Sequence, residues 1–88
     1  MKTVWKYQFE AFEAVKDFMI PMEATFLRCN SQKGLVTMWF LVQTTNILVK
    51  RRFFYTATGQ SVHFGTIYCG SCTQGEFEWH VWEERIPS

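Results

Sequence analysis

The fold is decided by the stretch Gly75-Glu76-Phe77-Glu78-Trp79-His80-Val81-Trp82-Glu83, near the end of the chain. Its side chains alternate with a period of two, which places Phe77, Trp79 and Val81 on one face and the residues between them on the other. This alternation is typical of a strand with one buried face and one face in water. The stretch therefore predicts a β-strand that packs aromatic rings against a core.

A similar pattern occurs at the other end of the chain, in Val4–Glu10, where Trp5 and Tyr7 share a face. Two aromatic strands at the termini, around a hydrophobic middle, indicate a small β-domain. We expect Trp5, Tyr7, Phe77 and Trp79 to meet in one shared interior.

Composition indicates a single globular domain over residues 1–88. The 88 residues include nine Phe, four Trp and three Tyr, with only two Pro and five Gly. Each buried aromatic side chain removes about 150–250 Å² from water, which compensates for the small core of a short chain. The net charge of +1 excludes attraction to nucleic acid or membranes through the overall field.

The sequence shows no sign of export or membrane insertion. No apolar run of signal-peptide length follows Met1, and the longest apolar run, Met38–Val42, is too short to span a bilayer. Three cysteines are an odd number without a disulfide framework, which favours a reducing cytoplasm. We expect no membrane partner.

Further strands are predicted where apolar residues alternate or run together between turn residues. Thr25–Cys29 is expected to pair antiparallel with Leu35–Val42 across the Asn30–Gly34 turn. Leu35–Val42 is apolar on both faces, so we expect a central strand covered on each side. The other predicted strands are Phe18–Pro21, Ile47–Thr56 and His63–Cys69, with Gly70–Gly75 as the loop before the terminal strand.

The segment at residues 10–18 has two interpretations. Ala11, Ala14, Val15 and Phe18 have helical spacing, which predicts one or two helical turns, whereas the absence of an N-cap favours a bulged strand. With about six or seven short strands in all, the sequence predicts an all-β fold, a small antiparallel sandwich or a partly open barrel.

Lys50-Arg51-Arg52 is the one basic run of the chain. Strand geometry places Lys50 and Arg52 on one face and Arg51 on the apolar face, which predicts a nearby sheet edge or a bulge. Aromatic neighbours and the turn Thr58-Gly59-Gln60-Ser61 make Lys50, Arg52, Thr58, Gly59 and Gln60 a candidate surface for a nucleotide or short nucleic acid. The alternative is an edge strand protected from aggregation by charge.

Cys69-Gly70-Ser71-Cys72 is the strongest metal-like feature, with Cys29, His63 and His80 as further possible ligands. A structural zinc site normally has a second paired spacing, which is missing, and a redox pair belongs at a helix N-terminus. We therefore expect no metal site and no cofactor, and interpret the cysteines as small packing residues.

No catalytic motif is present. The sequence contains no nucleophile elbow, phosphate-binding loop or dinucleotide fingerprint. Glu76 and Glu78 lie on the solvated face of the terminal strand, where they are expected to keep an edge strand soluble, and His80 is expected to be structural. We expect a protein that is not an enzyme.

Several of these segments, in this order, resemble a group of short phage and prophage proteins that form a domain of unknown function. The segments are Trp5-Lys6-Tyr7, Met19-Ile20-Pro21, Met38-Trp39-Phe40-Leu41-Val42, Thr58-Gly59-Gln60 and Phe77-Glu78-Trp79-His80-Val81-Trp82-Glu83. The resemblance covers nearly the whole chain and implies a phage origin rather than a mechanism. It also favours strand over helix at residues 10–18.

The chain departs from that group in three places. It has Gln60 where the pattern has histidine, Glu23 where the pattern has glycine, and cysteines at Cys69 and Cys72. The missing histidine leaves any role of that position open. Because the group lacks cysteines near Cys69 and Cys72, the resemblance speaks against a zinc site.

The sequence thus predicts a non-catalytic phage-type protein that acts in the host cytoplasm by binding. The first hypothesis is an inhibitor of a host protein or defence complex, with Trp82 and Tyr68 as anchors beside His80, since Trp and Tyr are enriched at interfaces. The second is the nucleotide sponge at Lys50 and Arg52, and the third is a virion or assembly accessory protein. An aromatic-rich chain of this size is also expected to form a homodimer.

Overall fold

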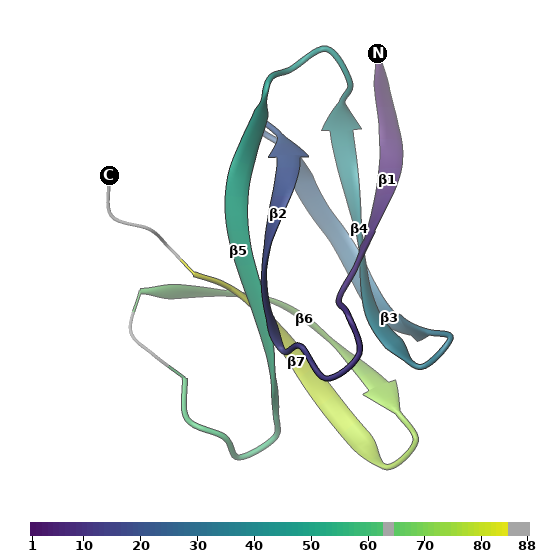
Figure 1. Cartoon of the computed structure of the whole chain (residues 1–88), viewed down its shortest axis with the longest axis vertical. Helices are drawn as coiled ribbons and strands as arrows, with labels where there is room; N and C mark the ends of the chain where they lie inside the picture. Colours follow the sequence, from purple (N-terminus) through teal and green to yellow (C-terminus); the bar gives the residue numbers. More distant parts are fainter. Residues whose placement is uncertain (63–64, 85–88) are drawn as a thin grey trace.

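The computed structural model describes residues 1–62 and 65–84, which form seven β-strands and no helix (Figure 1). The strands are β1 Lys2–Gln8, β2 Val15–Pro21, β3 Thr25–Gln32, β4 Leu35–Gln43, β5 Leu48–Ala57, β6 Thr66–Gln74 and β7 Phe77–Glu84.

The strands form two antiparallel sheets, ordered β1-β4-β3 and β2-β5-β7-β6. The two sheets pack face to face as a small sandwich and do not close into a barrel, which confirms the predicted all-β class. The strands β3 and β6 approach each other most closely, with Cα atoms of the two strands within 8 Å.

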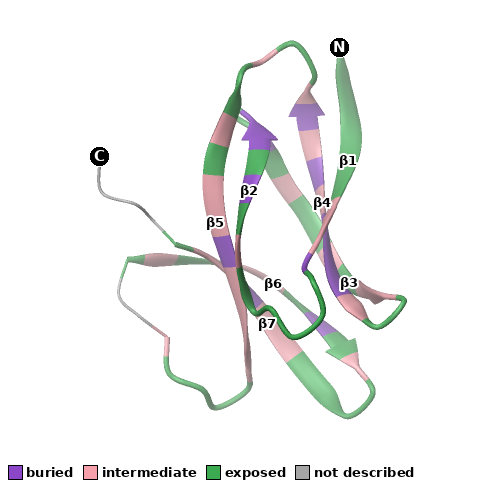
Figure 2. Cartoon of the chain, viewed as in Figure 1, coloured by how far each residue is buried: buried purple, intermediate pink, exposed green. Residues whose placement is uncertain are grey.

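The core lies between the inner faces of the sheets and is built largely from phenylalanine. Phe40 of β4 meets Phe53 of β5 across the interface, with ring centroids 5.4 Å apart and the rings edge to face. Figure 2 shows the buried segments concentrated on β2 and β4. The fully buried hydrophobic side chains are Phe9, Ile20, Met38, Phe40, Phe53, Val42 and Val81.

A tight turn fixes the β3–β4 hairpin. The β3–β4 turn is Lys33-Gly34, with φ of 52° and 77°, and positive φ at both positions is what a type I′ turn requires. The predicted pairing of Thr25–Cys29 with Leu35–Val42 is therefore confirmed, through a tighter turn than Asn30–Gly34.

The helical interpretation of residues 10–18 is wrong. The chain makes a turn after β1, in which the Glu13 amide donates to the Glu10 carbonyl over 3.2 Å, and then enters β2 at Val15. Pairing with β5 and burial of Phe18 in the core outweigh the helix propensity of the alanines.

The predicted shared interior of four terminal rings is only half correct. Tyr7 and Trp79 pack against the core, but Trp5 is 38% and Phe77 60% exposed. Both exposed rings belong to the inward-facing set of their strands. Phe77 is the first residue of β7, whereas Trp5 lies in the middle of β1, an edge strand of its sheet.

Other strand predictions also need correction. Gly70–Gln74 belongs to β6 rather than to a loop, and the predicted start of that strand at His63 lies outside the described residues. β4 is central in its sheet, but Trp39 and Leu41 on its outer side remain half-buried, so a second layer covers one face only. β5 and β7 lie inside their sheet, which rules out edge protection as the reason for their charges.

Candidate binding face

The candidate site is the outer face, defined as the side of the sheet β2-β5-β7-β6 that points away from the core. Strand register brings one residue from each strand into line across this face: Val15 pairs with Phe54, Phe54 with Trp82, and Trp82 with Tyr68. These four residues, which we name the aromatic row, cross the whole sheet.

The three rings of the aromatic row, those of Phe54, Trp82 and Tyr68, contact one another in sequence across the sheet. Phe54 and Trp82 are nearly parallel with centroids 6.5 Å apart, and Tyr68 meets Trp82 edge to face at 4.9 Å. Tyr68 is 50% exposed and Val15 54% exposed. The row therefore presents a continuous apolar surface to solvent.

Hydrogen bonds hold the two polar-tipped rings in place. The Trp82 Nε1–H donates to Thr56 Oγ1 over 3.0 Å, and the Tyr68 hydroxyl lies 3.0 Å from His80 Nδ1. His80 Nε2 lies 3.0 Å from Thr58 Oγ1 and 3.3 Å from Glu78 Oε1. His80 thus bridges Tyr68 to Thr58 and orients the Tyr68 ring.

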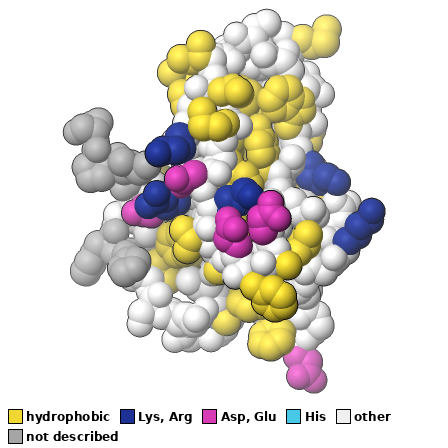
Figure 3. All heavy atoms as spheres, viewed as in Figure 1, with side chains coloured by type: hydrophobic (Ala, Val, Ile, Leu, Met, Phe, Trp, Pro, Cys, Tyr) yellow, Lys and Arg dark blue, Asp and Glu magenta, His cyan; other side chains and the backbone are white. Residues whose placement is uncertain are grey.

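The basic residues of this face are largely neutralised. Arg52 forms two contacts with the Asp17 carboxylate, at 2.7 and 3.3 Å, and lies 3.7 Å from Glu84. The Arg52 hydrogen bond lowers the pKa of Asp17, and its charge and that of Lys50 add to this effect. Dark blue and magenta side chains alternate on the left side of Figure 3, so no extended basic patch forms there.

The turn after β5 is closed by its own side chain. The Gln60 Oε1 accepts a hydrogen bond of 2.6 Å from the Ala57 amide, and Gly59 has a φ of 94°. A groove of about 1060 Å³ runs beside this turn, and none of its described lining residues, which include Phe54, Trp79 and Glu84, is basic. These residues offer a phosphate no cationic partner.

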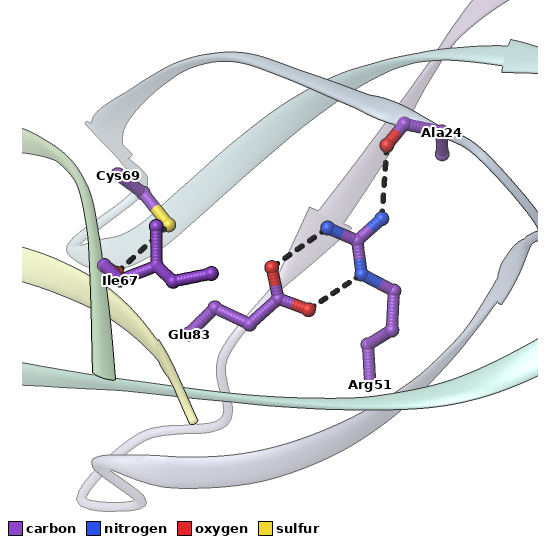
Figure 4. Close-up of polar contacts among 5 residues, drawn as sticks. All are labelled: Ala24, Arg51, Ile67, Cys69 and Glu83. Carbon is purple, nitrogen blue, oxygen red and sulfur yellow. Dashed lines mark hydrogen bonds and ion pairs between the residues drawn. The ribbon is translucent and has the colours of Figure 1, made fainter. Parts of the chain in front are cut away.

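Arg51 explains the charge on the apolar face of β5. There is no bulge: its guanidinium makes two bonds of 2.7 Å to the Glu83 carboxylate and donates to the Ala24 carbonyl over 2.9 Å (Figure 4). The hydrogen bond to Glu83 raises the pKa of Arg51. Both side chains retain about a fifth of their exposure, 22% and 18%. The pair ties β5 to β7 and to the segment that enters β3.

The possible metal ligands named from the sequence do not come together at one site. His80 lies on the outer face, whereas Cys29 and Cys72 belong to the inner side of the sandwich, and His63 lies outside the described residues. Within residues 1–62 and 65–84, no group of three His, Cys, Asp or Glu side chains is arranged to hold a metal ion.

Of the predicted binding residues, Lys50, Arg52, Tyr68, His80 and Trp82 share the outer face, and Thr58 joins them through His80. Gly59 and Gln60 form the adjoining turn. Sequence reasoning missed Phe54 as a surface residue. Phe54 lies two positions after Arg52 on the same strand, and this spacing could have placed it on the same face. It also missed Asp17, which only the pairing of β2 with β5 brings to Arg52.

Among the described residues there is no helix that could cross a membrane. No curated protein and no solved structure matched the chain. A family model, a domain of unknown function named DUF7352, matches residues 1–88. The chain therefore belongs to the DUF7352 family, a family defined without an assigned function.

Proposed function

We propose that this domain is a non-catalytic binding protein whose partner is a folded protein, and that the aromatic row is the centre of the interface. The observation that carries the proposal is the uncovered contact chain Phe54–Trp82–Tyr68 on a four-stranded sheet. Tyr and Trp provide large, rigid contact area, and side chains already fixed by hydrogen bonds lose little entropy on binding.

The ion pairs favour a protein over a nucleotide as partner. A phosphate would have to compete with Asp17 and Glu84 for the guanidinium of Arg52, and Gln60 is bound to its own turn. Lys50 is the remaining basic side chain of the predicted nucleotide surface. Charges of both signs along one side of an apolar centre, with Thr56 and His80 on the other side, instead resemble the polar rim of a protein interface.

The resemblance to short phage proteins extends the proposal. In that setting the partner is a host protein or defence complex in the host cytoplasm, which the domain inhibits by occupying a surface. The same face would serve a virion or assembly accessory protein, whose partner is another phage protein.

The test is affinity capture from host lysate with matched aromatic variants. Tyr68→Ala should reduce the captured partner at least about tenfold, since hot-spot residues contribute 2 kcal/mol or more. Trp39→Ala is the control, because Trp39 lies on the outer side of the other sheet, beneath Arg28. Equal capture by wild type and Tyr68→Ala, with loss in Trp39→Ala, would assign binding to the opposite face.

A further inference from the structure

Cysteines from both sheets meet where the sandwich is narrowest. Cys29 lies on β3 and packs against the core, and Cys72 lies on β6 and is 6% exposed. Cys69 is also near this group, and all three are free thiols. Residues far apart in sequence thus bring sulfur atoms together between the sheets.

The Cys29 sulfur lies against β6 beside Gly70, where a Cβ would be in ordinary contact with it at 3.7 Å. Cys72 lies two residues after Gly70 on the same inner face of β6. The Cys29 and Cys72 thiols also shift each other's pKa. Cα atoms of β3 and β6 come within 8 Å of each other, closer than the roughly 10 Å of ordinary stacked sheets. The two strands therefore approach the separation of about 4.4–6.8 Å at which a disulfide joins Cα atoms.

We propose that Cys29 and Cys72 form an oxidation site, at which a disulfide joins β3 to β6 and locks the two sheets together. The oxidant is a peroxide, which is small enough to reach a half-buried thiol. One thiolate attacks the peroxide oxygen, giving a sulfenic acid and water. The second thiol then displaces the sulfenic oxygen as water, and the sulfur–sulfur bond forms. In total, two thiols and one hydrogen peroxide give one disulfide and two waters.

Cys69 is the less suitable partner of either residue. It lies at the irregular step of β6 between Tyr68 and Gly70, outside the regular alternation that places Gly70 and Cys72 on the inner face. Its own thiol donates to the Ile67 carbonyl over 3.6 Å (Figure 4). Cys69 therefore remains a free thiol after oxidation.

The reaction is expected to be slow at neutral pH. Burial is the main reason that the pKa of Cys29 rises to about 12, and burial also raises the pKa of Cys72. Since the thiolate is the reactive form, oxidation should accelerate between pH 7 and pH 9.

The test is to treat the folded protein with hydrogen peroxide at pH 8.5 and count thiols after denaturation. We expect three thiols to fall to one, the mass to fall by two hydrogen atoms, and Tm to rise by about 10 °C. An increase in mass by oxygen atoms without a disulfide, or an unchanged thiol count, would overturn the proposal.

Peptide mapping cannot distinguish Cys69 from Cys72, because trypsin leaves both in one peptide. Three variants therefore assign the bond. Cys69→Ser should still form the disulfide, leaving no thiol, and Cys29→Ser should form none. Cys72→Ala should behave like Cys29→Ser. If the Cys72 variant does not fold, Cys29→Ser still tests the bond, because Cys29 is only half-buried. Loss of the disulfide in Cys69→Ser would contradict the assignment.

Discussion

Arg51 is the residue on which the interior depends most. Its guanidinium lies over the rings of Phe40 and Phe53, 5.5 and 5.3 Å from their centroids, while its polar atoms bond Glu83 and Ala24. It therefore connects the aromatic core to three segments of the chain. Removing one partner of such an ion pair leaves the other charge buried without compensation.

We predict that Arg51→Met lowers the free energy of unfolding by about 3 kcal/mol, the lower end of the range for buried pairs, because both side chains are partly exposed. The double variant Arg51→Met with Glu83→Leu should recover most of this loss. Urea denaturation measures both effects.

Lys50→Met, on the same strand but exposed, is the control for the charge change and should alter stability by less than about 0.5 kcal/mol. If Arg51→Met has as small an effect as Lys50→Met, the pair does not support the fold.

At the scale of single residues, the sequence predicted the strand face on which a side chain lies better than the residue that it contacts. Period-two alternation correctly placed Lys50 and Arg52 opposite Arg51, and Trp82 opposite Trp79. It could not show that Arg52 is neutralised by Asp17, because that contact depends on which strands are neighbours. The site was therefore predicted as a set of residues and not as a charge distribution.

Among the elements, the hairpin β3–β4 is the one most fully specified by local sequence. Its two strands are joined by the two-residue turn Lys33-Gly34. Gly34 suits the left-handed region, whereas Lys33 adopts it at a steric cost.

We predict that Lys33→Asn raises Tm by a few degrees, since asparagine tolerates a positive φ and favours the type I′ turn by about 0.5–1 kcal/mol. Thermal unfolding followed by circular dichroism measures the shift. Lys33→Val is the matched opposite, because a β-branched residue fits the left-handed region poorly and should lower Tm. A Tm that falls in Lys33→Asn would show that this turn does not limit stability.

The elements that sequence reasoning misassigned share a physical cause. Gly70 has low strand propensity and stands beside the turn-forming Ser71, yet both belong to β6 because β7 pairs with them and β3 packs against this strand. Residues 11–15 have helical spacing but lie beside β5, where the Tyr55 amide donates to the Ala14 carbonyl. In both cases tertiary pairing outweighs local preference.

For the whole molecule, the sequence predicted the all-β class but not the sheet order. Tyr7 of β1 and Trp79 of β7 reach the same core, but the sequence did not show that they do so from different sheets. The sheet order also assembles the aromatic row, because Trp82 and Tyr68 become neighbours only when β6 pairs with β7. The central claim of the account is that this row contacts the partner.

Hydroxyl-radical footprinting of the domain, alone and with its captured partner, tests that claim most directly. Tyr68, Trp82 and Phe54 should lose reactivity in the complex, while Trp39 on the outer side of the opposite sheet should keep its reactivity. Protection of Trp39 with unchanged reactivity at Tyr68 and Trp82 would contradict the claim.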